Sequence, residues 1–451
     1  MSVNRRTFML RAGGAAVGLS VTFAERPAAG RAPASAPTAA QPALEGFDPR
    51  ALSTLVNADP EFGLAAREWD ALVQLGIDDS NHGVSVRNGR VVEVAPAGPG
   101  SDFDVRIAGP LDAWRQGFGD YGLQTAGDDA DHRWPYQAAI LRLAALVRET
   151  LGAPVPEHLA DEVDREFDSI VGRYVYVRIR GTQYRVYFEE AGQGMPMVLQ
   201  HTAGSDSRQW RHLLEDRELQ QRFRMIAYDL PFHGRSLPPT TARWWTTEYR
   251  MDTQHLMDSI VAISNALSLE RPVYMGCSVG GYLAPDLAYY HPDKFRAVIG
   301  INSSIAGTLV ENKGKPYVSR FSHPQNGTAY IGSRMYMITS PEAREAFRRE
   351  TGWIYSQGGP GIFGGDLYYF SVEHDLRGKA HTIDTSRVGV HLLSGEYDPT
   401  ARGPAESLAA SIDGATYDVI EGGSHFAMSD DYPRFRQYLL PVLDRVYRER
   451  A

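Results

Sequence analysis

The chain has 451 residues, of which 43% are hydrophobic and 22% charged, a composition typical of globular proteins with more than one domain. Its formal net charge of −9, without a basic block, argues against nucleic acid as a partner. Cys277 is the single cysteine, which excludes an intramolecular disulfide and a thiolate metal cluster. No run reaches the roughly 20 apolar residues that span a bilayer. We therefore expect a soluble multi-domain protein without a metal, another cofactor or an integral membrane span.

The first residues resemble an export signal. Paired arginines lie within residues 4–8, a small and apolar stretch covers 12–24, and an Ala-Ser-Ala sequence at 34–36 fits a cleavage site. The paired arginines are similar to a twin-arginine signal, which export machinery for folded proteins recognises. We expect residues 1–42 to be a signal and an Ala/Pro-rich linker, and the mature protein to be periplasmic or extracellular. A basic tail with an accidental arginine pair is the alternative.

Residues 43–170 predict a small α+β domain. Apolar residues at helical spacing between Leu64 and Leu75 predict a helix. Period-two alternation around an Asn-Gly turn predicts a hairpin over 83–94. Residues 103–107 add a third strand and 136–147 a closing helix. This order resembles the sterol-carrier-protein-like domain, which implies a cradle for apolar ligands, and a packing domain without a ligand is the alternative.

Residues 171–451 show strands that alternate with helices. A hairpin is predicted over 174–188, and six short apolar runs of the kind buried on both faces of a parallel sheet follow it. These runs are 197–199, 223–228, 272–276, 297–301, 388–393 and 417–420. Apolar stripes between them predict covering helices. The fold class is therefore α/β, a doubly wound and mostly parallel sheet.

The alternation breaks over about 303–384, which predicts an inserted helical cap above the carboxyl edge of the sheet. The insertion is rich in glycine and aromatic residues. From it Trp353 and Tyr368, together with Trp244 and Trp245 after the run at 223–228, are the predicted substrate contacts.

The strongest motif is Gly276-Cys277-Ser278-Val279-Gly280, between the predicted strand at 272–276 and a helix over 282–290. In that context G-x-S-x-G is typical of a nucleophile elbow, a turn so tight that the residues two before and two after the nucleophile must be small. Ser278 is therefore the predicted nucleophile, and Cys277 is expected to point into the sheet as a small core residue.

A serine hydroxyl is a weak nucleophile and needs an oriented base. After such an elbow the acid and then the histidine are expected to follow later strands. Asp398 follows the run at 388–393, and His425 follows the run at 417–420. We predict that His425 removes the Ser278 proton and that Asp398 orients the imidazole. Glu396 is the alternative to Asp398.

Two backbone amides are expected to stabilise a developing oxyanion. The Val279 amide lies at the N-terminus of the helix after the elbow. The second amide is expected from the loop 201–204, with Ala203 as the first choice and Thr202 as the second. Thr202 replaces the glycine often found in such loops, and its hydroxyl offers a further donor.

Residues of about 174–448 resemble the α/β-hydrolase superfamily, because they contain the elbow and the later acid and histidine. The sequence from Asp229 to Ser236 is similar to the turn after the fourth strand of that superfamily, often Asp-x-x-Gly-x-Gly-x-Ser, with His233 close to a usual glycine. The resemblance implies a serine hydrolase that needs no cofactor. It leaves the substrate open.

A serine at the elbow argues against the haloalkane dehalogenases and epoxide hydrolases of this superfamily, which attack with an aspartate. The leading hypothesis is hydrolysis of a carboxylic ester or lactone of a bulky apolar small molecule through an acyl-enzyme. Carbon–carbon hydrolysis of a β-diketone-type substrate by the same triad, perhydrolase activity and a non-catalytic binding module of this fold are the alternatives. The oligomeric state stays open.

Overall fold

The computed structural model describes residues 47–98, 101–116, 124–153, 159–161, 167–307, 327–398 and 401–450. The predicted export signal at 1–42 lies outside these residues, as does part of the predicted cap. Residues 41–451 form one compact unit. In the parts of the chain that the structure describes, no helix combines the length and the apolar character needed to cross a bilayer.

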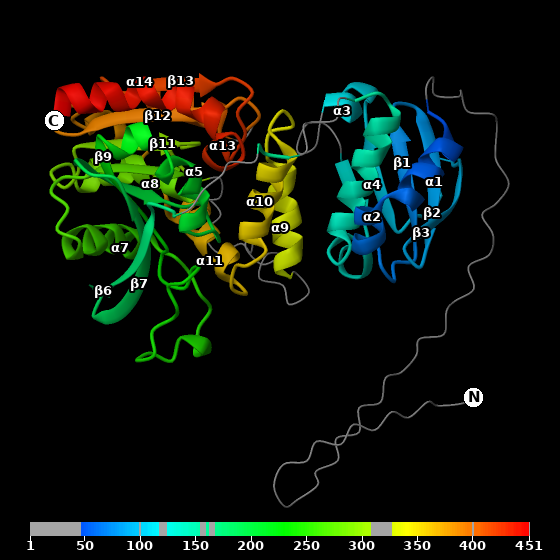
Figure 1. The fold of residues 1–451 in the computed structure, drawn as a ribbon, viewed down its shortest axis with the longest axis horizontal. Coiled ribbons are helices and arrows are strands. Elements are labelled where there is room, and N and C mark those ends of the chain that lie inside the picture. The colour runs from blue at the N-terminus through cyan, green and yellow to red at the C-terminus, as the bar shows by residue number, and fades with distance from the viewer. Residues whose placement is uncertain are drawn as a thin grey trace, which may run out of the picture. The chain divides into compact units, whose positions relative to one another are not determined.

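The N-terminal sheet has the strand order β3-β2-β1-β4-β5 (Figure 1). Its strands are β1 (Ala71–Ile77), β2 (Ser80–Arg87), β3 (Arg90–Pro96), β4 (Val105–Gly109) and β5 (Gln124–Gly127). The helices of this part are α1 (Pro49–Ala58), α2 (Pro60–Ala65), α3 (Leu111–Gln116) and α4 (Gln137–Thr150). The predicted hairpin is confirmed by the antiparallel pairing of β2 with β3, and the predicted closing helix by α4.

The helix predicted between Leu64 and Leu75 is wrong. Helix α2 ends at Ala65, and the backbone at Glu68 has a positive φ of 66°, which breaks the helix. The residues that follow form β1, the central strand of the N-terminal sheet, antiparallel to β2 and parallel to β4. The apolar spacing was ambiguous because both faces of β1 are largely buried, so its sequence lacks a clear period of two.

The main sheet has eight strands in the order β13-β12-β11-β10-β8-β9-β7-β6. They are β6 (Val171–Ile179), β7 (Thr182–Ala191), β8 (Met195–Gln200), β9 (Phe223–Tyr228), β10 (Val273–Cys277), β11 (Ala297–Ile301), β12 (Gly389–Gly395) and β13 (Thr416–Ile420). The strands from β13 to β9 pair in parallel, and the hairpin β6–β7 joins them antiparallel through β7 and β9. The predicted fold class is confirmed.

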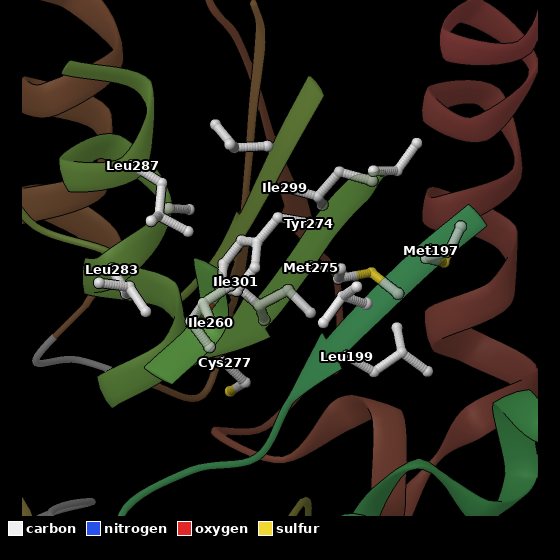
Figure 2. Close-up of a cluster of buried hydrophobic side chains, with 14 of the residues drawn as sticks. Met197, Leu199, Ile260, Tyr274, Met275, Cys277, Leu283, Leu287, Ile299 and Ile301 are labelled. Carbon is white, nitrogen blue, oxygen red and sulfur yellow. The ribbon is translucent and has the colours of Figure 1, made fainter. Parts of the chain in front are cut away.

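Helices follow the strands of the main sheet. They are α5 (Arg211–Leu214), α6 (Arg217–Gln220), α7 (Thr253–Ala266), α8 (Val279–Tyr290), α12 (Arg402–Ala410), α13 (Ala427–Asp430) and α14 (Tyr432–Arg450). Leu283 and Leu287 of α8 lie beside Tyr274 of β10 and Ile301 of β11 in the buried core (Figure 2). This packing fixes the strand-to-helix junction at Ser278.

The inserted segment is helical in its described part. Helices α9 (Thr328–Met337), α10 (Glu345–Tyr355) and α11 (Ile362–Tyr368) lie between β11 and β12 in sequence, followed by a π-helical turn at Tyr369–Glu373. Helices α9 and α10 contact each other, and α10 also contacts α13, just after the predicted catalytic histidine (Figure 1). The cap is therefore packed against a loop at the carboxyl edge of the main sheet.

Candidate active site

The turn between β10 and α8 has the geometry of a nucleophile elbow. Ser278 has φ 57° and ψ −116°, a strained conformation for a residue other than glycine. Its amide donates to the carbonyl of Ile301 at 2.9 Å. A Cβ at Gly276 would approach the Gly280 backbone to 2.6 Å, and one at Gly280 would approach the Gln200 side chain to 2.7 Å. Only glycines fit on both sides, as the motif predicts, and Ser278 remains partly exposed.

The predicted acid and base meet in the structure. The Nδ1 atom of His425 is hydrogen-bonded to Oδ2 of Asp398. The Asp398 side chain is buried, whereas that of His425 is 19% exposed. Both residues lie on loops at the carboxyl ends of parallel strands, at the same edge as Ser278. A hydrogen bond between Ser278 and His425 is absent from the described part of the chain. Bonds between nucleophile and base commonly tighten only when substrate binds.

Asn302, at the end of β11, joins the loops of the acid and the base. Its Nδ2 donates to the His425 carbonyl at 2.9 Å, and its Oδ1 accepts from the Gly395 amide at 3.0 Å. Asn302 is fully buried and has a positive φ of 53°, which aims its side chain between the two loops. No sequence motif singled out this residue. The signal available in the sequence is an asparagine directly after a buried strand, because asparagine adopts the left-handed conformation more readily than most residues.

Cys277 is a core residue, as predicted. Its side chain is fully buried, and burial raises the pKa of the thiol well above its usual value. The neutral Sγ donates to the His425 carbonyl at 3.1 Å, in parallel with Asn302. The thiol therefore helps to position the histidine loop.

The loop after β8 corrects one predicted oxyanion donor. The Thr202 amide donates to Oε1 of Gln209 at 3.0 Å, so it is engaged and not available to a ligand. The Thr202 hydroxyl is also engaged, by Gln209 and by the hydroxyl of Tyr355 from α10. By contrast, no acceptor for the amides of Ala203 and Val279 is found among the residues that the structure describes. Thr202, the second choice for the oxyanion donor, is therefore wrong. Ala203, the first choice, stays a prediction.

A buried carboxylate from the cap supports the same loop. The Oδ2 atom of Asp366 in α11 accepts from the Gly204 amide at 2.7 Å and lies 2.7 Å from Nε2 of His233. Its Oδ1 accepts from the Tyr249 hydroxyl at 2.9 Å. Gly204 needs φ +66°, and a Cβ there would approach Phe363 to 2.8 Å. Three segments thus converge on one carboxylate beside Ala203.

The pKa values of two buried histidines near this loop are shifted in opposite directions. Burial lowers the pKa of His201 to about 4, so the imidazole is neutral at pH 7, and its Nε2 accepts from the Leu230 amide at 3.1 Å. Burial also disfavours the charged form of His233, but the Asp366 carboxylate outweighs it and raises the pKa of His233. His201 therefore supports the loop as a neutral hydrogen-bonding residue.

The turn after β9 departs from the expected pattern at Phe232 rather than at His233. Phe232 has φ 76° and Gly234 φ 46°, so these two positions need the left-handed conformation. The Phe232 ring packs 5.0 Å from that of Tyr249 and 6.2 Å from that of Trp244. This aromatic packing holds a strained non-glycine residue in place.

The four predicted substrate contacts stay predictions, and three of them are exposed tryptophans. Trp353 is 65% exposed, two residues from Tyr355, so it projects from the opposite side of α10 to the residue that contacts Thr202. The Tyr368 ring packs under the guanidinium of Arg250 at 5.3 Å. Trp244 and Trp245 are 43% and 64% exposed, with their rings 5.7 Å apart. The side of α10 that carries Trp353 depends on where the helix begins, and the sequence alone does not define that residue.

Asp430 makes stability depend on pH. Burial raises the pKa of this carboxyl from 3.8 to about 6, while its Oδ2 accepts from Ser424 and Ser340. The folded chain therefore binds a proton that the unfolded chain releases between about pH 4 and 6, and this contribution to the free energy of unfolding falls by about 3 kcal/mol as pH rises through that window. Asp430→Asn keeps a side-chain acceptor but cannot release the proton, so its free energy of unfolding in urea should not fall by this amount over the same pH window. Parallel plots of the free energy of unfolding against pH for the two proteins would contradict the role of Asp430.

Comparisons with known proteins agree with this geometry. Residues 195–322 match the family model described as the alpha/beta hydrolase fold. Epoxide hydrolase 4 of Mus musculus is 31% identical over 166 residues, which cover 36% of this chain and 39% of that protein. The chain thus spans about two fifths of the length of that relative. An uncharacterized protein of Mycobacterium tuberculosis is 34% identical over 287 residues, which cover 56% of this chain and 76% of that protein.

Solved structures show the same fold. A thermophilic esterase from Thermogutta terrifontis superposes with a TM-score of 0.53 at 18% identity and covers 61% of this chain and 99% of its own. An enol-lactonase from Burkholderia xenovorans LB400 does so with a TM-score of 0.51 at 19% identity, over 60% of this chain and 99% of its own. Sheet order, elbow, family model and relatives agree: the chain belongs to the α/β-hydrolase superfamily.

Proposed function

We propose that the chain is a serine hydrolase that cleaves a carboxylic ester or lactone of a bulky apolar substrate through an acyl-enzyme. The observation that carries this proposal is the strained Ser278 at the end of β10, with the hydrogen-bonded Asp398–His425 pair at the same edge of the sheet. Aspartate, the nucleophile expected of epoxide hydrolases, is absent from this elbow position. A serine there favours acyl transfer.

The proposed reaction has two halves. The Ser278 Oγ attacks the carbonyl carbon of the ester while Nε2 of His425 accepts its proton, which forms a tetrahedral intermediate. His425 then gives this proton to the leaving alcohol, and the carbon–oxygen bond of the ester breaks. In the second half, water attacks the acyl-enzyme with His425 as the base, and the acid product leaves as Ser278 recovers its proton. Asp398 accepts from Nδ1 of His425 throughout and stabilises the imidazolium.

The amides of Val279 and Ala203 are the proposed donors to the oxyanion. Val279 begins α8, where helix amides have no acceptor within the helix. Ala203 lies between Thr202 and Gly204, whose amides are held by Gln209 and Asp366. With both neighbours anchored, the Ala203 amide is preorganised to donate, and loss of one such donor costs about a hundredfold to a thousandfold in rate.

A bulky apolar substrate is proposed because helices α9 to α11 and their aromatic residues form the insertion over the catalytic edge. Medium-chain and aromatic esters should then be better substrates than acetyl esters. Export through a twin-arginine signal, to the periplasm or beyond the cell, is proposed from the paired arginines within residues 4–8, the apolar stretch at 12–24 and the Ala-Ser-Ala sequence at 34–36. A lipid-cradling role for the domain at 43–170 is proposed from its sequence resemblance.

A fluorophosphonate and a panel of p-nitrophenyl esters test the proposed function. The chain should be labelled and should hydrolyse the esters, with a preference for the longer acyl groups. Labelling without ester turnover would contradict the ester assignment and favour lactone or carbon–carbon cleavage by the same triad. Absence of labelling would contradict Ser278 as the nucleophile and would favour a non-catalytic binding module of this fold.

Asp366→Ala is expected to lower kcat about tenfold to a hundredfold with little change in KM. The substitution leaves the Gly204 amide and His233 without their buried acceptor, which loosens the loop that carries Ala203. Asp366→Asn, which can still accept from Gly204, should recover most of the activity. Tyr249→Phe is the matched control because it removes only the bond to the other carboxylate oxygen. A change in KM alone, or equal losses in all three variants, would contradict the positioning role of Asp366.

A further inference from the structure

A cavity of about 680 Å³ lies between α4 and the cap helices α9 and α10, away from the elbow. Contacts between α4 and α9 and between α9 and α10 form its frame, and the last two helices lie side by side in Figure 1. The volume falls within the roughly 300–1,000 Å³ typical of small-molecule sites. Nothing in the proposed hydrolase mechanism uses it.

Small side chains keep the cavity open. Ala145 of α4, Ala329 and Gly332 of α9, and Ala346 of α10 line it, so three packed helices leave space where larger residues would close it. Along α10 the lining runs from Ala346 to Ser356, and ten residues of helix extend about 15 Å. An apolar lining that extends this far along a helix suits an aliphatic chain.

The charged groups around the cavity are already paired with one another. Arg142 binds Asp59 at 2.5 Å and Glu61 at 3.2 Å, and Arg349 binds Glu61 and Glu345. Glu345 also binds Arg348 at 3.0 Å, and Glu350 of the lining binds Arg211 at 2.7 Å, so that four arginines balance four carboxylates. Because each of these charged side chains already has a partner of opposite charge, none is free to pair with a ligand. A charged group of a ligand placed there would lose its hydration without gaining a counter-ion. The rim therefore favours an uncharged ligand.

The cavity and the candidate active site lie on different sides of α10. Tyr355 faces the Thr202 loop, whereas Trp353 and Ser356 line the cavity. Trp353 is 65% exposed, which leaves a large aromatic surface at the rim for an apolar ligand to cover. The two spaces thus share a wall but not their lining residues.

We propose that this cavity is a binding site for a single-chain lipid with an uncharged head group, such as a fatty alcohol, separate from the catalytic serine. The proposal rests on the cavity's small-residue lining, the extent of that lining along α10 and the paired rim charges. It does not depend on the chain being a hydrolase.

The test uses the full chain and the uncharged fluorescent probe N-phenyl-1-naphthylamine. The probe should bind with one saturable site, and 1-dodecanol should displace it at least tenfold better than dodecanoate, which has the same chain length with a charged head. Binding should be unchanged in Ser278→Ala and after fluorophosphonate treatment. A site that disappears in either case is the active site, and this would overturn the proposal whatever the outcome of the activity assays.

Two substitutions fill the cavity from different helices. Ala145→Phe and Ala346→Leu should each weaken probe binding at least tenfold, while Ala51→Phe, at an exposed position of α1 outside the cavity, should not. Thermal unfolding of each variant identifies those that remain folded, and the smaller Ala145→Leu replaces any that does not. Unchanged binding in the folded cavity variants, or equal displacement by dodecanoate, would overturn the proposed site or its ligand class.

Discussion

Replacing Ser278 with alanine is expected to lower kcat on a p-nitrophenyl ester by about a millionfold, the loss typical of removing a triad nucleophile. The methyl group cannot form the acyl-enzyme, and the remaining donors only stabilise direct attack by water. Stability should change little, because the Ser278 side chain makes no hydrogen bond within the described residues and Ala fits the space. Steady-state kinetics with purified variants provide the measurement.

Ser259→Ala is the matched control for this variant. Ser259 is buried on α7, where its hydroxyl donates to the His255 carbonyl, remote in sequence from every predicted catalytic residue. Its activity should remain close to that of the unmodified chain. Residual activity above about a hundredth of the starting value in Ser278→Ala, with contamination excluded, would contradict a nucleophilic role for this serine.

Asp398→Asn is expected to lower kcat about ten-thousandfold. Asparagine keeps the shape of the side chain but presents an amide to Nδ1 of His425, which favours the wrong imidazole tautomer and no longer stabilises the imidazolium. The loss should exceed that of any loop-positioning variant and remain smaller than that of Ser278→Ala. Steady-state kinetics on a p-nitrophenyl ester provide the measurement.

Glu396→Gln separates the two acids that the sequence offered. The Oε2 atom of Glu396 accepts from the Gly422 amide at 2.8 Å, and the residue is exposed, so it supports the turn after β13 and does not contact His425. Its loss of activity should be less than about tenfold. A Glu396→Gln variant as inactive as Asp398→Asn would show that the wrong carboxylate has been paired with the base.

The elements that position the candidate catalytic residues could be predicted because their signals are local. Buried parallel strands appear as continuous apolar runs, and the tight turn at Ser278 requires small residues at Gly276 and Gly280. The pairing of Asp398 with His425 follows from their positions after adjacent strands β12 and β13, whose carboxyl ends lie at one edge. These features need only the order of elements along the chain.

The supports of the site could not be predicted because they join distant segments through single side chains. Tyr355 lies 153 residues from Thr202, and Asp366 lies 162 residues from Gly204. No repeat or motif marks these residues, and their roles depend on how the cap packs on the sheet. The misassigned strand β1 had a different cause, since burial on both faces removed its period of two.

The acyl-enzyme itself is the most direct test of the central claim. The full chain is mixed with a slowly hydrolysed p-nitrophenyl ester, quenched with acid within the first turnovers and digested, and its peptides are analysed by mass spectrometry. The account predicts the mass of one acyl group on the peptide that contains Ser278, and none in Ser278→Ala. Continuous ester hydrolysis with no acyl group on Ser278, or with the acyl group on another residue, would contradict it.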